Sequence, residues 1–357
     1  LCYFAAVYSK EHSVAAPGLA LALTLLLRPP SRETWRLVAP FFLFSVVVPI
    51  AVILQMKGVI ATSYESNASG MLARGAMLQG LNEVPNAHLL SIISQSLLFF
   101  KYLALWVLPN PAWMSADMRE PLALSVFAWP HTAGLAGFLL YVATALYLLC
   151  RRGRRGLCGF AMLFPAVLFV TEFSTVRIQE AFVLYRSYLW MPGLFLLLPL
   201  LLGRVPGRWA FVALTLLALA FVPLTLNRIQ SFSSPYALWD DAEKLVRGKQ
   251  GVFGMERTYF NLGTELGTLG RYEEAAAAFS QAIKIYPYYD FIYGNRATAY
   301  FFLKKYDEAL ADYNRAIELN PDNEKSYYGR AIVYQNIGNW PAAQADFAKS
   351  CSLGLCP

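Results

Sequence analysis

The chain has 357 residues, of which 57% are hydrophobic and only 15% are charged, and its formal net charge is +7. This balance is that of a membrane protein diluted by a soluble part. Much of the positive charge lies in short basic turns between apolar runs, where the positive-inside rule accounts for it, so no nucleic-acid partner is expected. Five scattered cysteines exclude a disulfide framework and a CxxC zinc site, although a pairing of Cys351 with Cys356 stays open.

The first part of the chain predicts a polytopic membrane domain over residues 1–227. A helix needs roughly 20 apolar residues to cross a bilayer, and somewhat shorter runs are tolerated where the bilayer thins. The chain begins at Leu1, without Met and inside an apolar stretch, so we expect it to be the C-terminal part of a longer protein. The predicted spans are Ser13–Leu27, Leu37–Gln55, His131–Cys150, Leu157–Thr171, Tyr188–Leu202 and Trp209–Leu226.

The basic turns predict how these spans are oriented. Residues 28–36, 151–155 and 204–208 are expected on the cytoplasmic side. All three share that side only if the apolar run 89–108 does not cross. That run contains Lys101 and is followed by Pro109, which favours a re-entrant or interfacial helix, although a true span stays open. Without a crossing there, the tail of the chain lies outside the cytoplasm.

Several charged residues stand at the expected outer surface of the membrane. Arg186 directly precedes an apolar run, and a guanidinium there suits the oxygens of a phosphate, but it equally fits an interfacial arginine paired with Glu180. Lys10 and Glu11 form a charged pair between two apolar stretches, and the residues by themselves favour a solvated helical hairpin turn there. His88 opens the run 89–108; isolated histidines are usually structural. No cluster of residues has the spacing of a metal site.

The last part of the chain carries a repeat of 34 residues, after an expected linker over residues 228–255. Pro287 and Pro321 are 34 residues apart, and in that register small and aromatic residues recur at fixed offsets. This is typical of tetratricopeptide (TPR) repeats, in which small residues let two helices approach closely. We expect three repeats over residues 256–357, with these recurring positions: Leu262, Gly263, Ala275, Phe279 and Ala282; Arg296, Ala297, Ala309, Tyr313 and Ala316; Tyr327, Ala331, Tyr334, Ala343 and Phe347.

Polar residues of the repeats form the candidate binding groove. Asn261, Asn295, Arg296 and Arg330, with Asn336, recur on the first helix of each repeat, and amide side chains are able to pair with the backbone of an extended polypeptide. The alternative is that these are polar positions of solvated helix faces, and that the short array only caps the membrane domain.

Five short motifs occur in the order found in one known family. They are residues 8–11 (YSKE), 88–90 (HLL), 105–109 (LWVLP), 115–117 (SAD) and 185–193 (YRSYLWMPG). Together with the repeats that follow them, they resemble the transmembrane and TPR-containing protein O-mannosyltransferases and their bacterial relatives, of the GT-C glycosyltransferase class. The resemblance implies an all-α fold, in which a GT-C-like multi-pass helix bundle is followed by a short TPR solenoid. It also implies a transferase that moves a sugar from a polyprenyl-phosphate donor to a protein acceptor outside the cytoplasm, in a bacterial inner membrane.

The same resemblance implies roles for individual residues. Arg186, with Lys10, becomes the candidate for binding the donor phosphate, while Glu11, Glu180, Asp117 and His88 become possible supporting residues. The acidic residue that would act as catalytic base is expected upstream of Leu1, and any divalent metal would be bound there as well. The alternative is a membrane-anchored TPR scaffold for envelope, pilus or polysaccharide assembly, without chemistry of its own.

Overall fold

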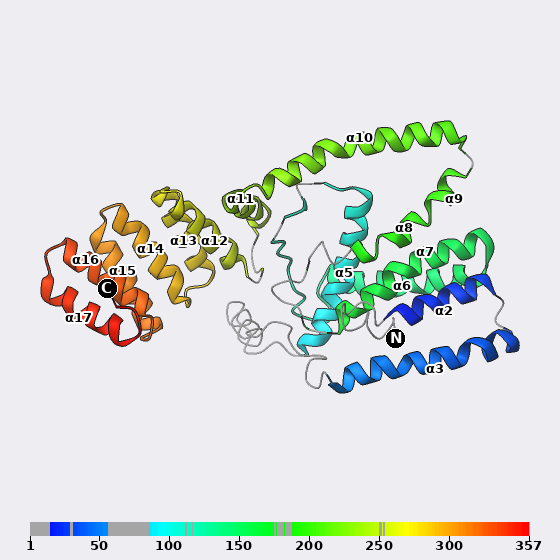
Figure 1. Ribbon diagram of the computed structural model, residues 1–357, viewed down its shortest axis with the longest axis horizontal. Coiled ribbons are helices and arrows are strands. Elements are labelled where there is room, and N and C mark those ends of the chain that lie inside the picture. The colour runs from blue at the N-terminus through cyan, green and yellow to red at the C-terminus, as the bar shows by residue number, and fades with distance from the viewer. Residues whose placement is uncertain are drawn as a thin grey trace. The chain divides into compact units, whose positions relative to one another are not determined.

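The computed structural model describes residues 15–28, 31–55, 86–110, 113–115, 117–174, 176, 182, 188–203, 205–249, 252 and 254–356. Within these residues every regular element is a helix, which confirms the all-α class (Figure 1). The chain divides into two compact units. The first unit comprises Leu1–Met114 and Glu120–Leu226, and the second comprises Ser115–Arg119 and Asn227–Pro357.

The helices of the first unit follow most of the predicted apolar runs. Four helical segments in the described residues are long and apolar enough to cross a membrane: residues 87–107, 131–150, 153–173 and 207–231. The predicted span Tyr188–Leu202 instead contains two short helices, each with a proline in its first turn. The elements are α2 (Ala16–Leu27), α3 (Arg32–Gln55), α5 (Ala87–Val107), α6 (His131–Cys150), α7 (Gly153–Phe169), η3 (Val170–Phe173), α8 (Pro192–Phe195), α9 (Leu198–Leu202) and α10 (Gly207–Ser231).

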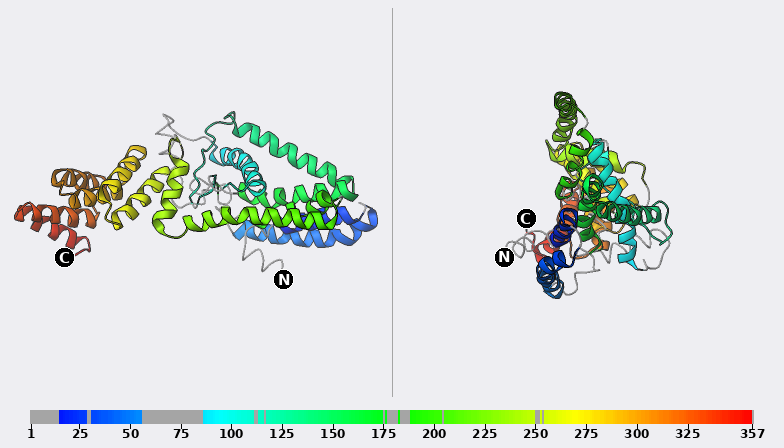
Figure 2. Two further views of the ribbon diagram at one scale, coloured as in Figure 1. Left: turned by 90° about the horizontal axis from the view of Figure 1, so that it is seen from above. Right: turned by 90° about the vertical axis from the view of Figure 1, so that its right-hand side faces the viewer.

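Helix α5 contributes many of the buried residues in the core of the first unit. It runs across the direction that α6 and α7 share (Figures 1 and 2). At the crossing, Gly134 of α6 lies so close to Leu97 that a β-carbon there would come within 2.6 Å of the Leu97 Cα. Phe99 is fully buried, and its ring contacts Phe138 at a centroid distance of 5.0 Å. Whether α5 crosses the membrane or lies in it stays a prediction.

Helix α10 has no buried residue along its whole length, although its sequence is apolar on every side. Helices that are hydrophobic all round are stable only inside a large core or in lipid, because water disfavours exposed apolar surface. The length and composition of α10 therefore suit a membrane environment.

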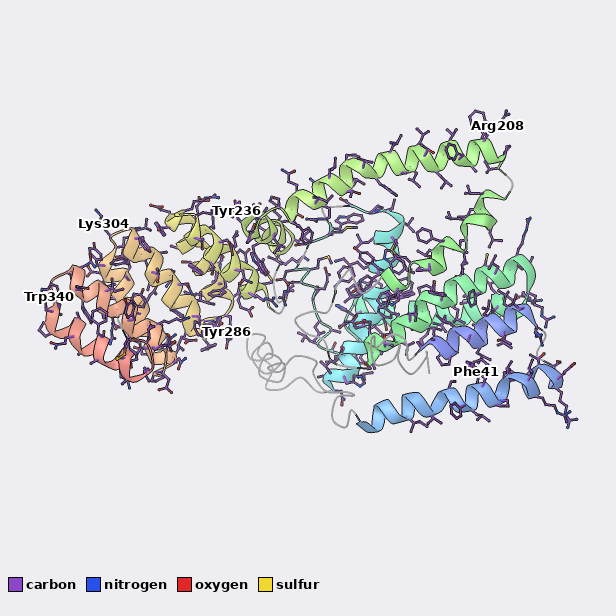
Figure 3. All side chains as sticks on the ribbon, in the orientation of Figure 1. Phe41, Arg208, Tyr236, Tyr286, Lys304 and Trp340 are labelled. Atoms are coloured by element: carbon purple, nitrogen blue, oxygen red, sulfur yellow. A yellow bond between two sulfur atoms is a disulfide. The ribbon has the colours of Figure 1, made fainter. Side chains whose placement is uncertain are left out.

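The second unit contains three pairs of antiparallel helices after one further helix. Residues 228–255, predicted as a linker, hold the end of α10 and the whole of helix α11. This helix forms because Ser234 caps its first turn and because Tyr236 and Trp239 pack against the first pair; Tyr236 is labelled in Figure 3. The elements are α11 (Pro235–Val246), α12 (Met255–Thr268), α13 (Tyr272–Ile285), α14 (Asp290–Phe302), α15 (Tyr306–Leu319), α16 (Glu324–Asn336) and α17 (Trp340–Ser352).

The predicted repeat positions form the core of these pairs. Ala275, Ala297, Ala309 and Ala331 are completely buried, which lets the backbones of paired helices approach closely. Aromatic residues fill the space between repeats, as where the Tyr272 ring stacks on Phe302 at a centroid distance of 4.5 Å. The described residues of this region therefore form three helix pairs whose cores recur with the 34-residue period.

The turn inside each helix pair uses a left-handed backbone conformation at the same place in the period. The three residues are Gly270 (φ 74°), Lys304 (φ 60°) and Gly338 (φ 81°), each 34 residues after the previous one. Glycine adopts this conformation without steric strain, whereas a β-carbon makes it unfavourable. The geometry of the repeat therefore persists at Lys304 even though the residue type does not favour it.

Candidate functional site

A hollow of about 230 Å³ opens between α12 and α14 in the second unit. Its α12 residues are two adjacent pairs four residues apart, and its α14 residues likewise recur within one or two turns, so each helix contributes one face. The start of α13 closes one side with an aromatic ring. The lining residues are Gly263, Thr264, Gly267, Thr268, Tyr272, Phe279, Asn295, Thr298, Ala299 and Phe302.

The lining of the hollow combines aromatic rings with small polar side chains and contains no Asp, Glu, Lys or Arg. The stacked rings of Tyr272 and Phe302 form one wall. Thr298 Oγ1 lies 2.9 Å from the Tyr313 hydroxyl, and Asn295 Nδ2 donates a hydrogen bond of 2.8 Å to the Phe291 carbonyl. These bonds hold the polar side chains in place.

The predicted groove residues separate into two groups. Asn295 lines the hollow, and Asn261 is half-buried on α12 outside that lining. Arg296 and Arg330 lie between helices instead, where each guanidinium forms two bonds of 2.7 Å to a carboxylate. Arg296 and Arg330 occupy the same position in the 34-residue period, which is why the sequence grouped them with the groove residues. In the structure, that position lies between the helices of a repeat.

These arginines connect neighbouring repeats. Arg296 binds Asp312 within its own repeat and donates to Ser280 Oγ of the preceding one at 2.9 Å. Arg330 repeats the arrangement with Asp346 and with Asn314 Oδ1 at 2.6 Å. Burial alone would lower the pKa of Arg296, but the hydrogen bonds and charge of Asp312 outweigh it and raise the pKa. Hydrogen bonding to Asp346 likewise raises the pKa of Arg330.

Asp117, expected as a supporting residue of the transferase site, anchors its segment to α12. Its carboxylate pairs with the buried Arg119 at 2.8 Å and accepts a hydrogen bond of 3.1 Å from Thr258 Oγ1. Arg119 in turn lies against Gly254, where a β-carbon would meet the guanidinium at 2.4 Å, and its carbonyl accepts from Lys249 Nζ at 3.2 Å. The geometry gives Asp117 a structural role in the second unit.

The remaining predicted residues belong to the first part of the chain. His88 Nε2 lies 2.6 Å from the carbonyl oxygen of Phe173, which ties the start of α5 to η3. Lys10, Glu11, Glu180 and Arg186 lie outside the described residues.

One charged pair was not singled out from the sequence. Lys101 of α5 forms an ion pair with Glu120, and its ammonium lies 4.8 Å from the centre of the Phe182 ring. The sequence signal for this pair was a lysine inside an apolar run, because a charged side chain in an apolar segment requires a counter-charge. Among the described residues, no group of three or more His, Cys, Asp or Glu side chains gathers as a metal site would require.

The two cysteines after α17 are joined. Cys351 and Cys356 form a disulfide that closes the turn at the end of the last helix. The pairing left open by the sequence is thus present in the structure.

Comparison with known proteins identifies the repeats. A tetratricopeptide repeat family matches residues 256–289 and 291–323, and a second tetratricopeptide repeat family matches residues 312–345. No curated protein sequence matches the chain. The C-terminal region therefore contains TPR repeats, a module that mediates protein interactions.

Solved TPR domains are also similar to parts of the chain. The first TPR of Spaghetti (RPAP3), bound to the HSP90 peptide SRMEEVD, is 28% identical over 28% of this chain and 79% of its own, with a TM-score of 0.27. The Arabidopsis OM64 TPR domain is 23% identical over 28% of this chain and 82% of its own, with a TM-score of 0.28. MamA is 19% identical over 36% of this chain and 72% of its own, with a TM-score of 0.32.

Proposed function

We propose that this chain is a membrane-embedded protein O-glycosyltransferase component whose TPR repeats hold the acceptor polypeptide. In this proposal the hollow between α12 and α14 binds an extended segment of the acceptor. A polyprenyl-phosphate sugar donor binds beside Arg186 and Lys10. The hollow is the observation that carries the proposal, because it is an open site of defined chemistry on a module that mediates protein interactions.

The size and lining of the hollow favour a polypeptide over a cofactor. Pockets for drug-sized ligands occupy about 300–1,000 Å³, whereas this hollow measures about 230 Å³. That volume suits one or two side chains of a chain that continues on either side. Asn295 and Thr264 stand where amide and hydroxyl groups are able to pair with a peptide backbone.

Three features support the membrane and donor parts of the proposal. Four helical segments have the length and composition of membrane spans. Residues 185–193 carry the motif of the O-mannosyltransferase resemblance, and transfer from a lipid phosphate needs positive charge to stabilise the departing phosphate. The Cys351–Cys356 disulfide favours an oxidising, extracytoplasmic location for the repeats, because such bonds rarely persist in the cytosol.

A single substitution tests the acceptor site. A β-carbon at Gly267 would meet nothing within 4 Å, and Gly267 lies inside α12, so Gly267→Leu introduces a bulky side chain at the lining of the hollow and favours the helix. We expect this variant, in the full chain in nanodiscs, to lose at least about ten-fold in affinity for labelled synthetic peptides, which corresponds to about 1.4 kcal/mol. Ala277→Leu, at an exposed position of α13, is the matched control and leaves the affinity unchanged. Equal affinity in both variants would remove the hollow from acceptor binding.

Arg186→Ala tests the transferase part. We expect the variant to insert and fold in membranes and to lose transfer of labelled sugar from a polyprenyl-phosphate donor to the acceptor, because the leaving phosphate loses its counter-charge. Lys10→Ala with Glu11→Ala acts in the same direction with a smaller effect. A protein that performs its cellular role equally well without Arg186 and Lys10 would instead be a scaffold.

Topology is tested with the C-terminal cysteines. After mild reduction, Cys351 and Cys356 should react with a membrane-impermeant thiol reagent in intact cells, with Cys2, Cys150 and Cys158 replaced by Ser. Protection until the cells are permeabilised would place the repeats in the cytoplasm and contradict the proposal.

A further inference from the structure

We infer that the hollow selects an uncharged polypeptide segment, one that inserts a proline or aliphatic side chain and carries no acidic or basic residue at the inserted position. This inference rests on the proposed function and specifies the chemical class of the acceptor. Three observations carry it: the absence of charge in the lining, the aromatic wall, and an aromatic surface that continues from the hollow along one face of α14.

The lining of the hollow offers no charged group that could pair with a charged ligand. The ten lining residues include no Asp, Glu, Lys or Arg. The nearby Arg296 is held by Asp312 and Ser280, and Arg271 is held by Glu274. A charged side chain that enters the hollow would lose water without gaining a counter-charge, which is strongly unfavourable.

The aromatic wall favours a compact apolar side chain. Tyr272 and Phe302 stack with an interplanar angle of 9°, and Phe279 adds a third ring to the lining. Ring faces pack well against proline and aliphatic groups, and proline also restricts the unbound peptide, so less conformational entropy is lost on binding.

The aromatic surface extends the site beyond the hollow. On α14, Phe291, Asn295, Thr298 and Phe302 recur at intervals of three or four residues and therefore lie on one face. Phe291 and Tyr289 are both exposed, with ring centroids 5.4 Å apart. The face from Phe291 to Phe302 is about 16 Å long, since each helical residue rises about 1.5 Å, and about five extended residues cover that distance.

Exposed charged residues of the repeat region lie outside this lining. Arg257 and Lys325 are exposed near the starts of α12 and α16. A peptide attracted mainly by these cations would be acidic, and its affinity would fall steeply with salt. A peptide selected by the hollow would be neutral, and its affinity would change little with salt.

Two matched synthetic peptides decide between these outcomes. One is a labelled peptide of repeating Thr-Pro-Val, and the other has Glu in place of each Val; both are titrated with the full chain in nanodiscs and followed by fluorescence anisotropy. We expect the neutral peptide to bind at least about ten-fold more tightly at physiological salt, a difference of about 1.4 kcal/mol. We also expect its binding to weaken in Gly267→Leu and in Phe291→Ala.

The outcomes separate this inference from the proposed function. If the acidic peptide binds equally or more tightly and still depends on Gly267, the selectivity is wrong while the hollow remains a peptide site. If neither peptide binds, or if Gly267→Leu changes neither affinity, the hollow is not an acceptor site and both proposals fail.

Discussion

The first and second repeats place different chemistry at the same point of a common helix pair. In α12 and α13, positions 262 and 278 are Leu and Ala, and both side chains are buried. One period later, Arg296 and Asp312 occupy these positions and form a partly buried ion pair. The comparison teaches that the repeat backbone accepts either an apolar contact or an ion pair there, provided that both members change together.

The largest expected effect comes from breaking that pair. Arg296→Ala leaves the Asp312 carboxylate, whose side chain is only 9% exposed, without its counter-charge. Loss of one partner of a buried pair typically costs about 3 kcal/mol or more. We expect unfolding of the repeats at lower urea concentration, measured by circular dichroism, and faster hydrogen exchange in α14 and α15.

A double substitution is the control. Arg296→Leu with Asp312→Ala copies the first repeat, and we expect it to recover most of the lost stability, because no charge is left buried. If the double variant were as unstable as Arg296→Ala, the Arg296–Ser280 link between repeats would be more important than the charge pair.

The next effect concerns an attachment that only the first repeat has. Thr258 of α12 donates to Asp117, whereas the equivalent position of the second repeat is the buried Ile292. Asp117→Ala removes the carboxylate that pairs with buried Arg119, and we expect α12 to lose about 2 kcal/mol of protection in hydrogen exchange.

Thr258→Val sharpens this test. It removes one neutral hydrogen bond and keeps the Asp117–Arg119 pair, so we expect a smaller loss of about 1 kcal/mol. Equal losses in the two variants would show that the charge pair adds nothing to the attachment.

The smallest effect concerns the turns. Lys304 adopts the left-handed conformation that Gly270 adopts in the first repeat (Figure 3 labels Lys304). Lys304→Gly relieves this strain, but glycine loses more conformational entropy on folding. We expect the relief to be larger, with a net increase of about 0.5 kcal/mol in the free energy of unfolding, measured as a higher midpoint of urea unfolding. Gly270→Ala should act in the opposite direction, and a neutral result for both would mean that the turn relaxes freely.

Local periodicity explains why the second unit was largely predictable. TPR helices contact mainly their neighbours in the chain, so a fixed spacing of Ala275, Ala309 and Ala343 determines which residues are buried. In the first unit, apolar composition predicted several helices but not how they pack. The crossing of α5 over α6 depends on Gly134 meeting Leu97 from a distant part of the chain, which no local pattern encodes.

The site was predicted only in part for the same reason. Asn295 lines the hollow, whereas Arg296, its neighbour in sequence, turns into the interior. Adjacent helical residues point about 100° apart, and the partners that decide between binding and packing, Ser280 and Asp312, lie on other helices. The sequence did not mark Gly267 as a site residue, because its place in the site depends on the open space between α12 and α14.

By itself, the sequence determined the helical class and the presence and register of TPR repeats in the C-terminal region, since these follow from composition and short-range spacing. The tertiary structure alone decided that Asp117 anchors α12, that α11 packs on the first repeat, and that the hollow carries no charge. Each of these depends on contacts between residues far apart in the chain, whose energies are set by burial and pairing in three dimensions.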